Sequence, residues 1–205
     1  SSFWSPVLLW LTSLFNPCGA GDPACGAGDP AWPSSVRLWT RAFCPSVSGG
    51  LFVAACWTHG KPNTHQRRGK GSEPGLDIHK STQFMVVRST DHGATWTTPE
   101  NWTTKLKNPA WHLFAPAPGN GITLKNGTLV MPTQGRDENG IPFSNIISSK
   151  DHGKTWTVSN PARDNTTECA VAELSDGSLL LNMRDNRNYH SKDQPLSGRS
   201  VYITK

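Results

Sequence analysis

The chain has 205 residues, enough for one all-β domain or two small ones with a buried core. With 9 tryptophans, 19 glycines, 16 prolines and only 17% charged residues, the composition favours short strands joined by many turns. The net charge of +5 favours an anionic ligand, but lysine and arginine are scattered, so the sequence argues against a nucleic-acid partner.

Residues 1–42 differ from the rest of the chain. The stretch 7–15 is apolar, but it is too short to span a bilayer and lacks the basic flank of a signal peptide, so we predict no transmembrane or targeting segment. The heptapeptide CGAGDPA then occurs twice in tandem, and such small residues have little to bury. We therefore expect residues 1–42 to be a low-complexity segment, either a disordered tail or a stretch foreign to the domain. We place the folded domain at 43–205.

The cysteines and the short motifs exclude several kinds of site. The five cysteines show no metal-ligand spacing, and their odd number predicts no complete disulfide framework; they are Cys18, Cys25, Cys44, Cys56 and Cys169. No nucleotide-binding glycine motif occurs, and we expect neither a cofactor nor a metal. Glycosylation sequons at Asn101, Asn126 and Asn165 would fit a secreted, lysosomal or membrane-associated protein, but they leave the compartment undetermined.

From about residue 43 onward, one element recurs three times: a polar turn ending in glycine, followed by an apolar run of β type. The copies occupy residues 48–57, 125–134 and 175–184. A second strand-like segment follows each copy, at residues 84–89, 143–148 and 199–204. Repeats of this size that each supply antiparallel strands predict blades of a β-propeller.

Two octapeptides, at residues 89–96 and 149–156, share the pattern S-x-D-H-G-x-T-W. In such a pattern Asp accepts hydrogen bonds from turn amides, Gly supplies a positive φ, and Trp anchors the returning strand. The pattern therefore predicts a staple for a β-hairpin rather than a catalytic Asp-His pair. We expect His92 and His152 to be exposed turn residues.

Equivalent positions of propeller blades converge on one end of the central channel. The residue eight positions past each turn centre is Trp57, Gln134 or Arg184, so we expect these three around a common mouth. For Trp57, packing within the sheet is the alternative interpretation. We expect Arg136, just beyond Gln134, to be a solvated loop residue.

The third copy brings a carboxylate beside a guanidinium. Its hairpin turn centres on Asp176, with Glu168 eight residues before and Arg184 eight residues after, so the two should face each other on one side of the hairpin. Taken alone, such a pair is either a structural ion pair or half of an anion-binding catalytic site. The predicted convergence with Gln134 favours the functional interpretation.

The two octapeptides resemble the Asp-boxes that recur in sialidases. A more specific feature is the combination E-C-x-V-A-E-L…N-x-R, which begins at Glu168 and ends at Arg184. In the order of these motifs, residues 84–205 resemble the middle blades of an exo-α-sialidase (neuraminidase), with a weaker match from about residue 43. The resemblance implies an all-β, six-bladed sialidase propeller of which about three blades are present.

The resemblance also implies a chemistry and a substrate. Sialidases remove terminal sialic acid from glycoproteins, glycolipids or oligosaccharides with retention, through a tyrosine nucleophile. By similarity Glu168 matches the base that activates this tyrosine, and Arg184 matches one of three arginines that bind the substrate carboxylate. Gln134 matches a position that contacts the sugar, and Trp57, at the equivalent repeat position, completes the expected substrate-binding set.

Other parts of the family pattern are not matched. The Arg-Ile-Pro signature and the acid/base Asp that follows it do not occur near the start, and neither Tyr189 nor Tyr202 matches the nucleophile. Thr204 and Lys205 align with the first two positions of a third Asp-box, so we expect a chain cut inside a motif, without hydrolytic turnover and with unpaired sheet edges. A noncatalytic Asp-box propeller that binds sugars or protein partners is the alternative. A misassembled product whose first 42 residues replace the true first blade is another.

Overall fold

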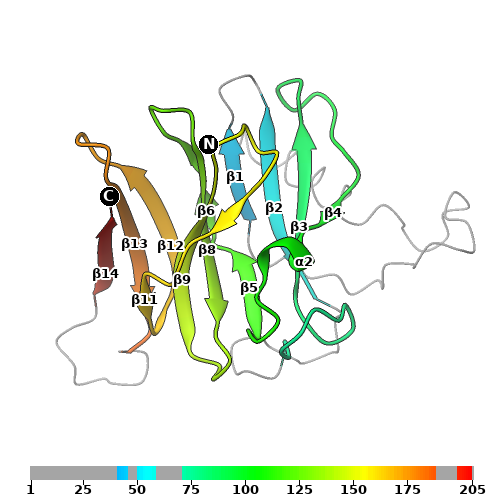
Figure 1. Ribbon diagram of the computed structural model, residues 1–205, viewed down its shortest axis with the longest axis vertical. Helices are drawn as coiled ribbons and strands as arrows, with labels where there is room; N and C mark the ends of the chain where they lie inside the picture. The colour runs from blue at the N-terminus through cyan, green and yellow to red at the C-terminus, as the bar shows by residue number, and fades with distance from the viewer. Residues whose placement is uncertain (1–40, 46–49, 59–70, 188–197, 205) are drawn as a thin grey trace, which may run out of the picture.

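The computed structural model describes residues 41–45, 50–58, 71–187 and 198–204, and it is built almost entirely of β-strands (Figure 1). In these ranges the helix is a single short turn, α2 (Thr103–Leu106). Most of residues 1–42 lie outside the described residues, as do Tyr189 and Lys205, so the predicted domain boundary stays a prediction. None of the described helical structure is long and apolar enough to cross a membrane.

The strands form three sheets, which follow one another along the chain except that the short strand β6, which comes after β5 of the second sheet, joins the first (Figure 1). The first sheet contains, in spatial order, β4 (Glu100–Asn101), β3 (Gln83–Ser89), β2 (Leu51–Trp57), β1 (Arg41–Pro45) and β6 (Gly119–Asn120). Only the pairing of β1 with β6 is parallel; the other neighbours in this sheet are antiparallel.

The second and third sheets are antiparallel throughout. The second contains β10 (Thr157–Val158), β9 (Pro142–Ser149), β8 (Leu129–Arg136) and β5 (Leu113–Pro116), with β11 (Arg163–Asp164) on β9 and β7 (Ile122–Thr123) on β8. The third contains β12 (Thr166–Glu173), β13 (Leu179–Asp185) and β14 (Arg199–Thr204).

The threefold repeat predicted from the sequence is present in these sheets. The three apolar runs form β2, β8 and β13, and the segments that follow them form β3, β9 and β14. Within each sheet the two repeat strands are antiparallel neighbours. The all-β fold class is therefore confirmed, and the three sheets correspond to the three predicted blades.

Two apolar cores hold the sheets face to face. The first lies between the first and second sheets and includes Phe52, Phe84, Phe114, Met131 and Phe143, all at most 6% exposed. The second lies between the second and third sheets and includes Val130, Cys169, Leu181 and Met183. β8 is apolar on both faces, with Met131 in the first core and Val130 in the second, because the second sheet lies between two neighbours and has no side left for water.

The first Asp-box closes on itself through side-chain hydrogen bonds. Ser89 Oγ donates to Asp91 Oδ1 at 2.7 Å and accepts the N–H of Gly93 at 2.8 Å. Asp91 accepts the backbone N–H of Thr95 at 2.8 Å and the Thr95 hydroxyl at 2.5 Å. The indole N–H of Trp96 donates to the Gly93 carbonyl at 3.0 Å. Asp91 therefore fixes the turn by accepting hydrogen bonds from within the box, and Trp96 is tied to the turn through Gly93.

The second Asp-box, at residues 149–156, repeats these contacts. Asp151 accepts the backbone N–H of Thr155 at 2.9 Å and its hydroxyl at 2.5 Å. The predicted hairpin staple is confirmed in both copies, and His92 and His152 are exposed as expected. Each histidine also has a positive φ, 58° and 59°, which the sequence pattern did not indicate because only the glycine was expected to need it.

A buried lysine ties two loops together at the start of the second sheet. Lys107, only 4% exposed, donates through Nζ to the carbonyl of Gly75 at 2.7 Å, to Ser81 Oγ, and to the carbonyl of His112 at 3.4 Å. Burial lowers the pKa of this ammonium group to about 8. The contacts join the loop before β3 to the segment between α2 and β5.

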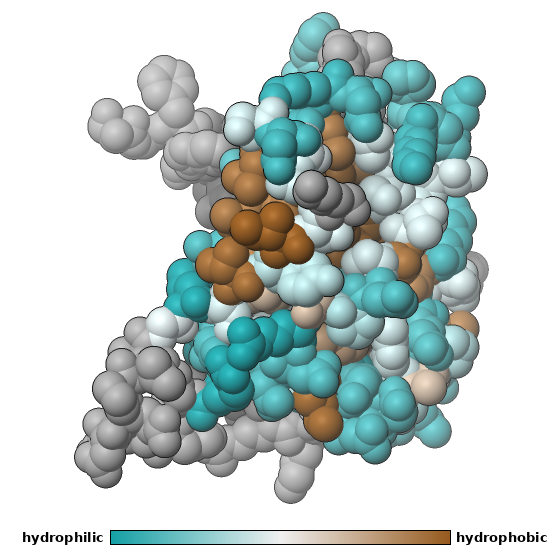
Figure 2. All heavy atoms as spheres, turned by 60° about the vertical axis from the view of Figure 1, so that its left-hand side comes forward, coloured by the Kyte–Doolittle hydropathy of each residue, from teal (hydrophilic) through white to brown (hydrophobic). Residues whose placement is uncertain are grey.

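The last strand of the third sheet presents an apolar surface. Val201, Tyr202 and Ile203 on β14 are 50%, 45% and 56% exposed. Figure 2, which brings the β14 side forward, shows a hydrophobic patch on this face of the molecule. Among the described strands, β14 pairs only with β13 and forms the edge of the third sheet.

Candidate active site

The β12–β13 hairpin positions the predicted carboxylate and guanidinium. Its turn is closed by the N–H of Leu174, which donates to the Ser178 carbonyl at 2.8 Å, and Asp176 Oδ1 accepts the N–H of Ser178 at 3.0 Å. Near the turn, Val171 pairs with Leu181. This register is the one expected for a turn centred on Asp176, so the predicted hairpin is confirmed.

The register changes where the hairpin reaches the site. Thr167, not Glu168, is paired with Arg184, because a β-bulge makes Glu168 an extra residue between Thr167 and Cys169. The prediction that Glu168 directly opposes Arg184 in the ladder is therefore wrong. Glu168 has φ of +33°, a backbone conformation that residues other than glycine rarely adopt. The symmetry argument assumed an uninterrupted ladder and could not foresee this bulge.

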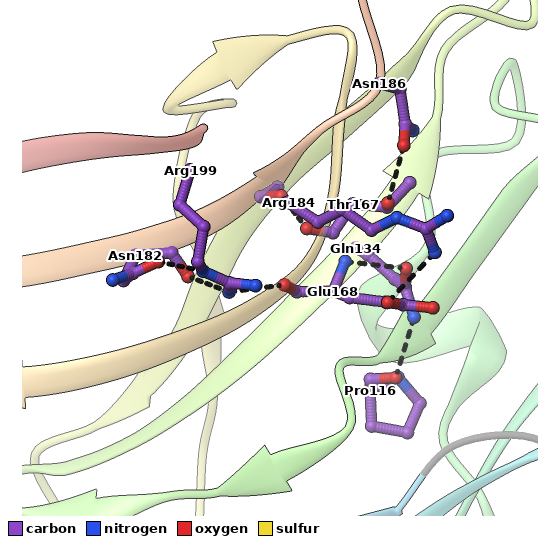
Figure 3. Close-up of polar contacts among 9 residues, drawn as sticks. Pro116, Gln134, Thr167, Glu168, Asn182, Arg184, Asn186 and Arg199 are labelled. Carbon is purple, nitrogen blue, oxygen red and sulfur yellow. Dashed lines mark hydrogen bonds and ion pairs between the residues drawn. The ribbon is translucent and has the colours of Figure 1, made fainter. Parts of the chain in front are cut away.

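The two side chains nevertheless meet. Arg184 Nη1 lies 3.0 Å from Glu168 Oε2 (Figure 3). The side chains are 31% and 45% exposed, so water and small solutes can reach both groups. An ion pair this exposed contributes only about 0–1 kcal/mol to stability, and a competing anion can displace the carboxylate from the guanidinium.

Gln134 reaches the same place from the second sheet. Its Oε1 accepts the backbone N–H of Glu168 at 3.1 Å, and its Nε2 donates to the carbonyl of Pro116 at 3.4 Å (Figure 3). Gln134 is 8% exposed, so its carboxamide is largely covered. The structure therefore brings Gln134 to Glu168 across the boundary between two sheets.

Trp57 and Arg136 have other surroundings. Trp57 is 4% exposed and packs with Val53, Ala55 and Met85 on the face of the first sheet that turns away from the second. The prediction that Trp57 is the repeat equivalent of Gln134 is wrong, because the ladder registers match Gln134 to Cys56. The substrate-binding role of Trp57 stays a prediction. Arg136 is the last residue of β8 and is partly buried, and burial lowers the pKa of its guanidinium. The prediction that Arg136 is a solvated loop residue is wrong, because the strand continues two positions beyond Gln134 and packs against its neighbours on both sides.

Sequence reasoning missed Arg199. This residue begins β14, directly across the ladder from Arg184. Its Nη2 donates to the carbonyl of Glu168 at 3.2 Å and to the carbonyl of Asn182 at 3.1 Å, while its Nε donates to Asn182 Oδ1 (Figure 3). The cross-strand pairing could have been found by counting residues, but the contact with a main-chain carbonyl at a bulge could not.

Cys169, next to Glu168, is a structural residue. Its Sγ donates to the carbonyl of Thr133 at 3.2 Å, and it belongs to the core between the second and third sheets. Burial raises the pKa of its thiol to about 12, so it stays protonated and unreactive at neutral pH. Within the described ranges, no three His, Cys, Asp or Glu side chains are placed to hold a metal ion.

Comparisons with known proteins place this geometry in a family. A BNR repeat-like domain matches residues 51–197. The chain is 45% identical over 158 residues to a sialidase of Bacteroides fragilis, covering 77% of this chain and 27% of that one. It is 33% identical over 151 residues to a sialidase of Paraclostridium sordellii, covering 69% of this chain and 35% of the relative.

The solved structures agree. The Hadza microbial sialidase Hz136 superposes with a TM-score of 0.74 at 40% identity, over 87% of this chain and 33% of that one. Trypanosoma rangeli sialidase superposes with a TM-score of 0.65 at 22% identity, which shows the fold alone. The chain spans only about a third of the length of these proteins. It belongs to the sialidase family with a BNR repeat-like domain and covers part of that family's fold.

Proposed function

We propose that Glu168 and Arg184 are the general base and one carboxylate-binding arm of a sialidase site. The substrate class is the terminal sialic acid of glycoproteins, glycolipids or oligosaccharides. The observation that carries the proposal is the solvent-accessible Glu168–Arg184 pair on a strained bulge, in a chain that belongs to the sialidase family.

The energetics favour function over a structural role for the pair. A residue other than glycine with positive φ costs about 1–3 kcal/mol. An exposed ion pair returns about 0–1 kcal/mol. The conformation of Glu168 is therefore not explained by the stability that its ion pair with Arg184 provides. Strain of this kind is common where a backbone is shaped for a reaction rather than for stability.

Arg184 has the chemistry to bind a sialic acid carboxylate. A guanidinium offers several N–H groups in one plane and pairs with carboxylates through two parallel hydrogen bonds. When a substrate carboxylate arrives, Arg184 binds it in place of, or together with, Glu168. If the complex excludes water, losing one such arm costs on the order of 2–5 kcal/mol of binding.

Glu168 then acts on the nucleophile. Sialic acid carries its carboxylate beside the anomeric carbon, which repels an anionic nucleophile, so a neutral tyrosine activated by a glutamate base suits this substrate. Trypanosoma rangeli sialidase has been solved in complex with 2,3-difluorosialic acid as a covalent intermediate, which supports a covalent, retaining route for this family. In this chain no residue matches the tyrosine, the acid/base Asp or the other two arginines, so we expect the 205-residue chain alone to show no turnover.

The test is sialic acid binding by the purified chain, followed by NMR of the arginine side-chain Nε–H signals. We expect N-acetylneuraminic acid to shift the Arg184 signal and its methyl ester, which lacks the charge, to leave it unchanged. Arg184→Met should weaken binding at least about tenfold. Arg187→Met is the matched control, because Arg187 pairs with Asp185 on the same hairpin and is exposed.

Either of two results would contradict the proposal. Equal shifts with the acid and the methyl ester would mean that Arg184 does not bind the carboxylate. Equal loss of binding in Arg184→Met and Arg187→Met would mean that the hairpin binds anions nonspecifically, and a noncatalytic binding module would then be favoured. Hydrolysis of a fluorogenic sialoside by this chain, lost in Glu168→Ala, would instead show that the site is more complete than its residues indicate.

A further inference from the structure

The main chain of Glu168 is bound on both sides by side chains from other strands. Its N–H donates to Gln134 Oε1 at 3.1 Å, and its carbonyl accepts from Arg199 Nη2 at 3.2 Å (Figure 3). Gln134 comes from β8 in the second sheet, and Arg199 comes from β14 in the third. A bulge residue loses its ladder partners, so these two side chains replace the hydrogen bonds that a regular strand would provide.

Both side chains are themselves held in place. The Nε2 of Gln134 donates to the Pro116 carbonyl, which fixes the carboxamide so that its oxygen, the acceptor, faces Glu168. Arg199 is held by the side chain and the carbonyl of Asn182. Each contact to Glu168 therefore comes from a group with little freedom to turn away, which is the arrangement expected of a preorganised support.

The residues on either side of Glu168 are fixed as well. The Thr167 carbonyl accepts from Ser144 Oγ at 3.2 Å, and the Cys169 thiol donates to the Thr133 carbonyl at 3.2 Å. Relaxation of the bulge is therefore opposed on both flanks. The positive φ of Glu168 can persist only because the surroundings over-determine it.

We propose that Gln134 and Arg199 are positioning residues that hold Glu168 in its left-handed bulge and so aim its carboxylate at Arg184. The inference rests on the proposed function for what the Glu168 carboxylate does there. The clamp, meaning the hold of Gln134 and Arg199 on the Glu168 main chain, concerns backbone conformation alone. It gives Gln134 a role that acts through Glu168, since Gln134 is buried and its carboxamide already has a partner at both ends. It also assigns a role to Arg199.

The experiment uses NMR of the purified chain to follow the Glu168 backbone. The three-bond HN–Hα coupling reports φ, and hydrogen exchange reports the hydrogen bond of the Glu168 N–H. Gln134→Met, which keeps the length but removes both hydrogen-bonding atoms, should speed exchange of the Glu168 amide about tenfold, the effect of one lost hydrogen bond. Arg199→Met should shift the coupling toward extended values, and Arg199→Lys, which keeps one donor, should restore part of the change.

Two controls separate positioning from a general loss of stability. Arg187→Met should leave the Glu168 signals as in the wild type, because Arg187 bonds to Asp185 and not to the bulge. Exchange of the Val86 amide in the first sheet should not change in any variant, since it reports opening far from the bulge. If Gln134→Met does not fold, Gln134→Asn, one methylene shorter, removes the same contact with less disturbance.

Unchanged coupling and exchange at Glu168 in folded Gln134 and Arg199 variants would overturn the inference. Equal acceleration at Glu168 and Val86 would also overturn it, because both side chains would then act on global stability. The sialic acid titration is read separately at Arg184. A wild-type chain that fails to bind sialic acid, while its Glu168 backbone still responds to Gln134→Met, would refute the proposed function and leave the clamp intact.

Discussion

The two Asp-boxes allow one substitution to be compared in two settings. Gly93 and Gly153 occupy the same position of the motif and have nearly the same φ, +88° and +86°. Replacement by alanine therefore imposes the same backbone penalty at both, about 1–2 kcal/mol for a left-handed alanine. The surroundings differ, because Gly93 faces Leu51 at the start of β2, whereas Gly153 faces the ring of Phe52, the next residue.

The space around the added methyl group decides how much further each variant is destabilised. At Gly93 a Cβ would lie 3.3 Å from Leu51 Cδ1 and 3.5 Å from Trp96 Cζ2, which neighbouring side chains can accommodate with small movements. At Gly153 it would lie 2.8 Å from Phe52 Cε2 and closer still to Cζ, against a ring that packs on Trp156 at a centroid distance of 5.6 Å. Overpacking of a core ring costs about 1–3 kcal/mol. We expect Gly93→Ala to cost about 1–2 kcal/mol and Gly153→Ala about 2–5 kcal/mol.

The measurement is urea unfolding of the two variants, with the slope of the transition as a check that the same surface is exposed. A double variant, Gly153→Ala with Phe52→Leu, should be more stable than the sum of the two single effects, since the smaller side chain makes room for the methyl group. Equal destabilisation by Gly93→Ala and Gly153→Ala, or strict additivity in the double variant, would refute the packing argument.

Two further predictions concern pH. Hydrogen bonds from the Thr95 hydroxyl and N–H lower the pKa of Asp91 to about 2, and Thr155 likewise lowers that of Asp151, so their contribution is present above the ordinary value near 4 and is lost as pH falls. The double variant Asp91→Asn with Asp151→Asn should therefore show a flatter decline in stability between pH 4 and pH 2 in urea unfolding. Lys107 has a pKa of about 8 in the folded protein against 10.5 as its ordinary value, so the unfolded chain binds more protons between these values and stability should rise with pH there. In Lys107→Met this rise should be missing; an unchanged rise would mean that other groups cause it.

Much of the fold was predictable because its signals are local. A glycine turn followed by an apolar run predicts a strand wherever it occurs, and three copies predicted β2, β8 and β13. The Asp-box likewise contains its own hydrogen-bonding partners, so its structure does not depend on the rest of the fold. Where donor and acceptor lie within a few residues, sequence reasoning was sufficient.

The errors came from contacts between sheets and from an irregular ladder. The bulge at Glu168 has no local signal, and its backbone partners Gln134 and Arg199 lie 34 and 31 residues away in the chain. Arg136 was expected in solvent because two residues past a predicted strand end usually means a loop, but β8 continues through it beside β5 and β9. These features depend on which strands become neighbours, which residue types alone do not specify.

The repeat positions show how far symmetry can carry a functional argument. In the ladders, Leu51 and Leu129 pair with Ser89 and Ser149, the first residues of the two Asp-boxes, so Gln134 corresponds to Cys56 and not to Trp57. Trp57 therefore lies on the opposite face of its strand, where its neighbours are apolar and it is buried by packing. Gln134 lies beside the backbone N–H of the bulge at Glu168, so its side chain accepts a hydrogen bond. Arg184 lies beside a carboxylate open to water, so its guanidinium can exchange that carboxylate for another anion. Ladder register thus decides which residues are equivalent, and their neighbours in adjacent sheets determine what each side chain can do.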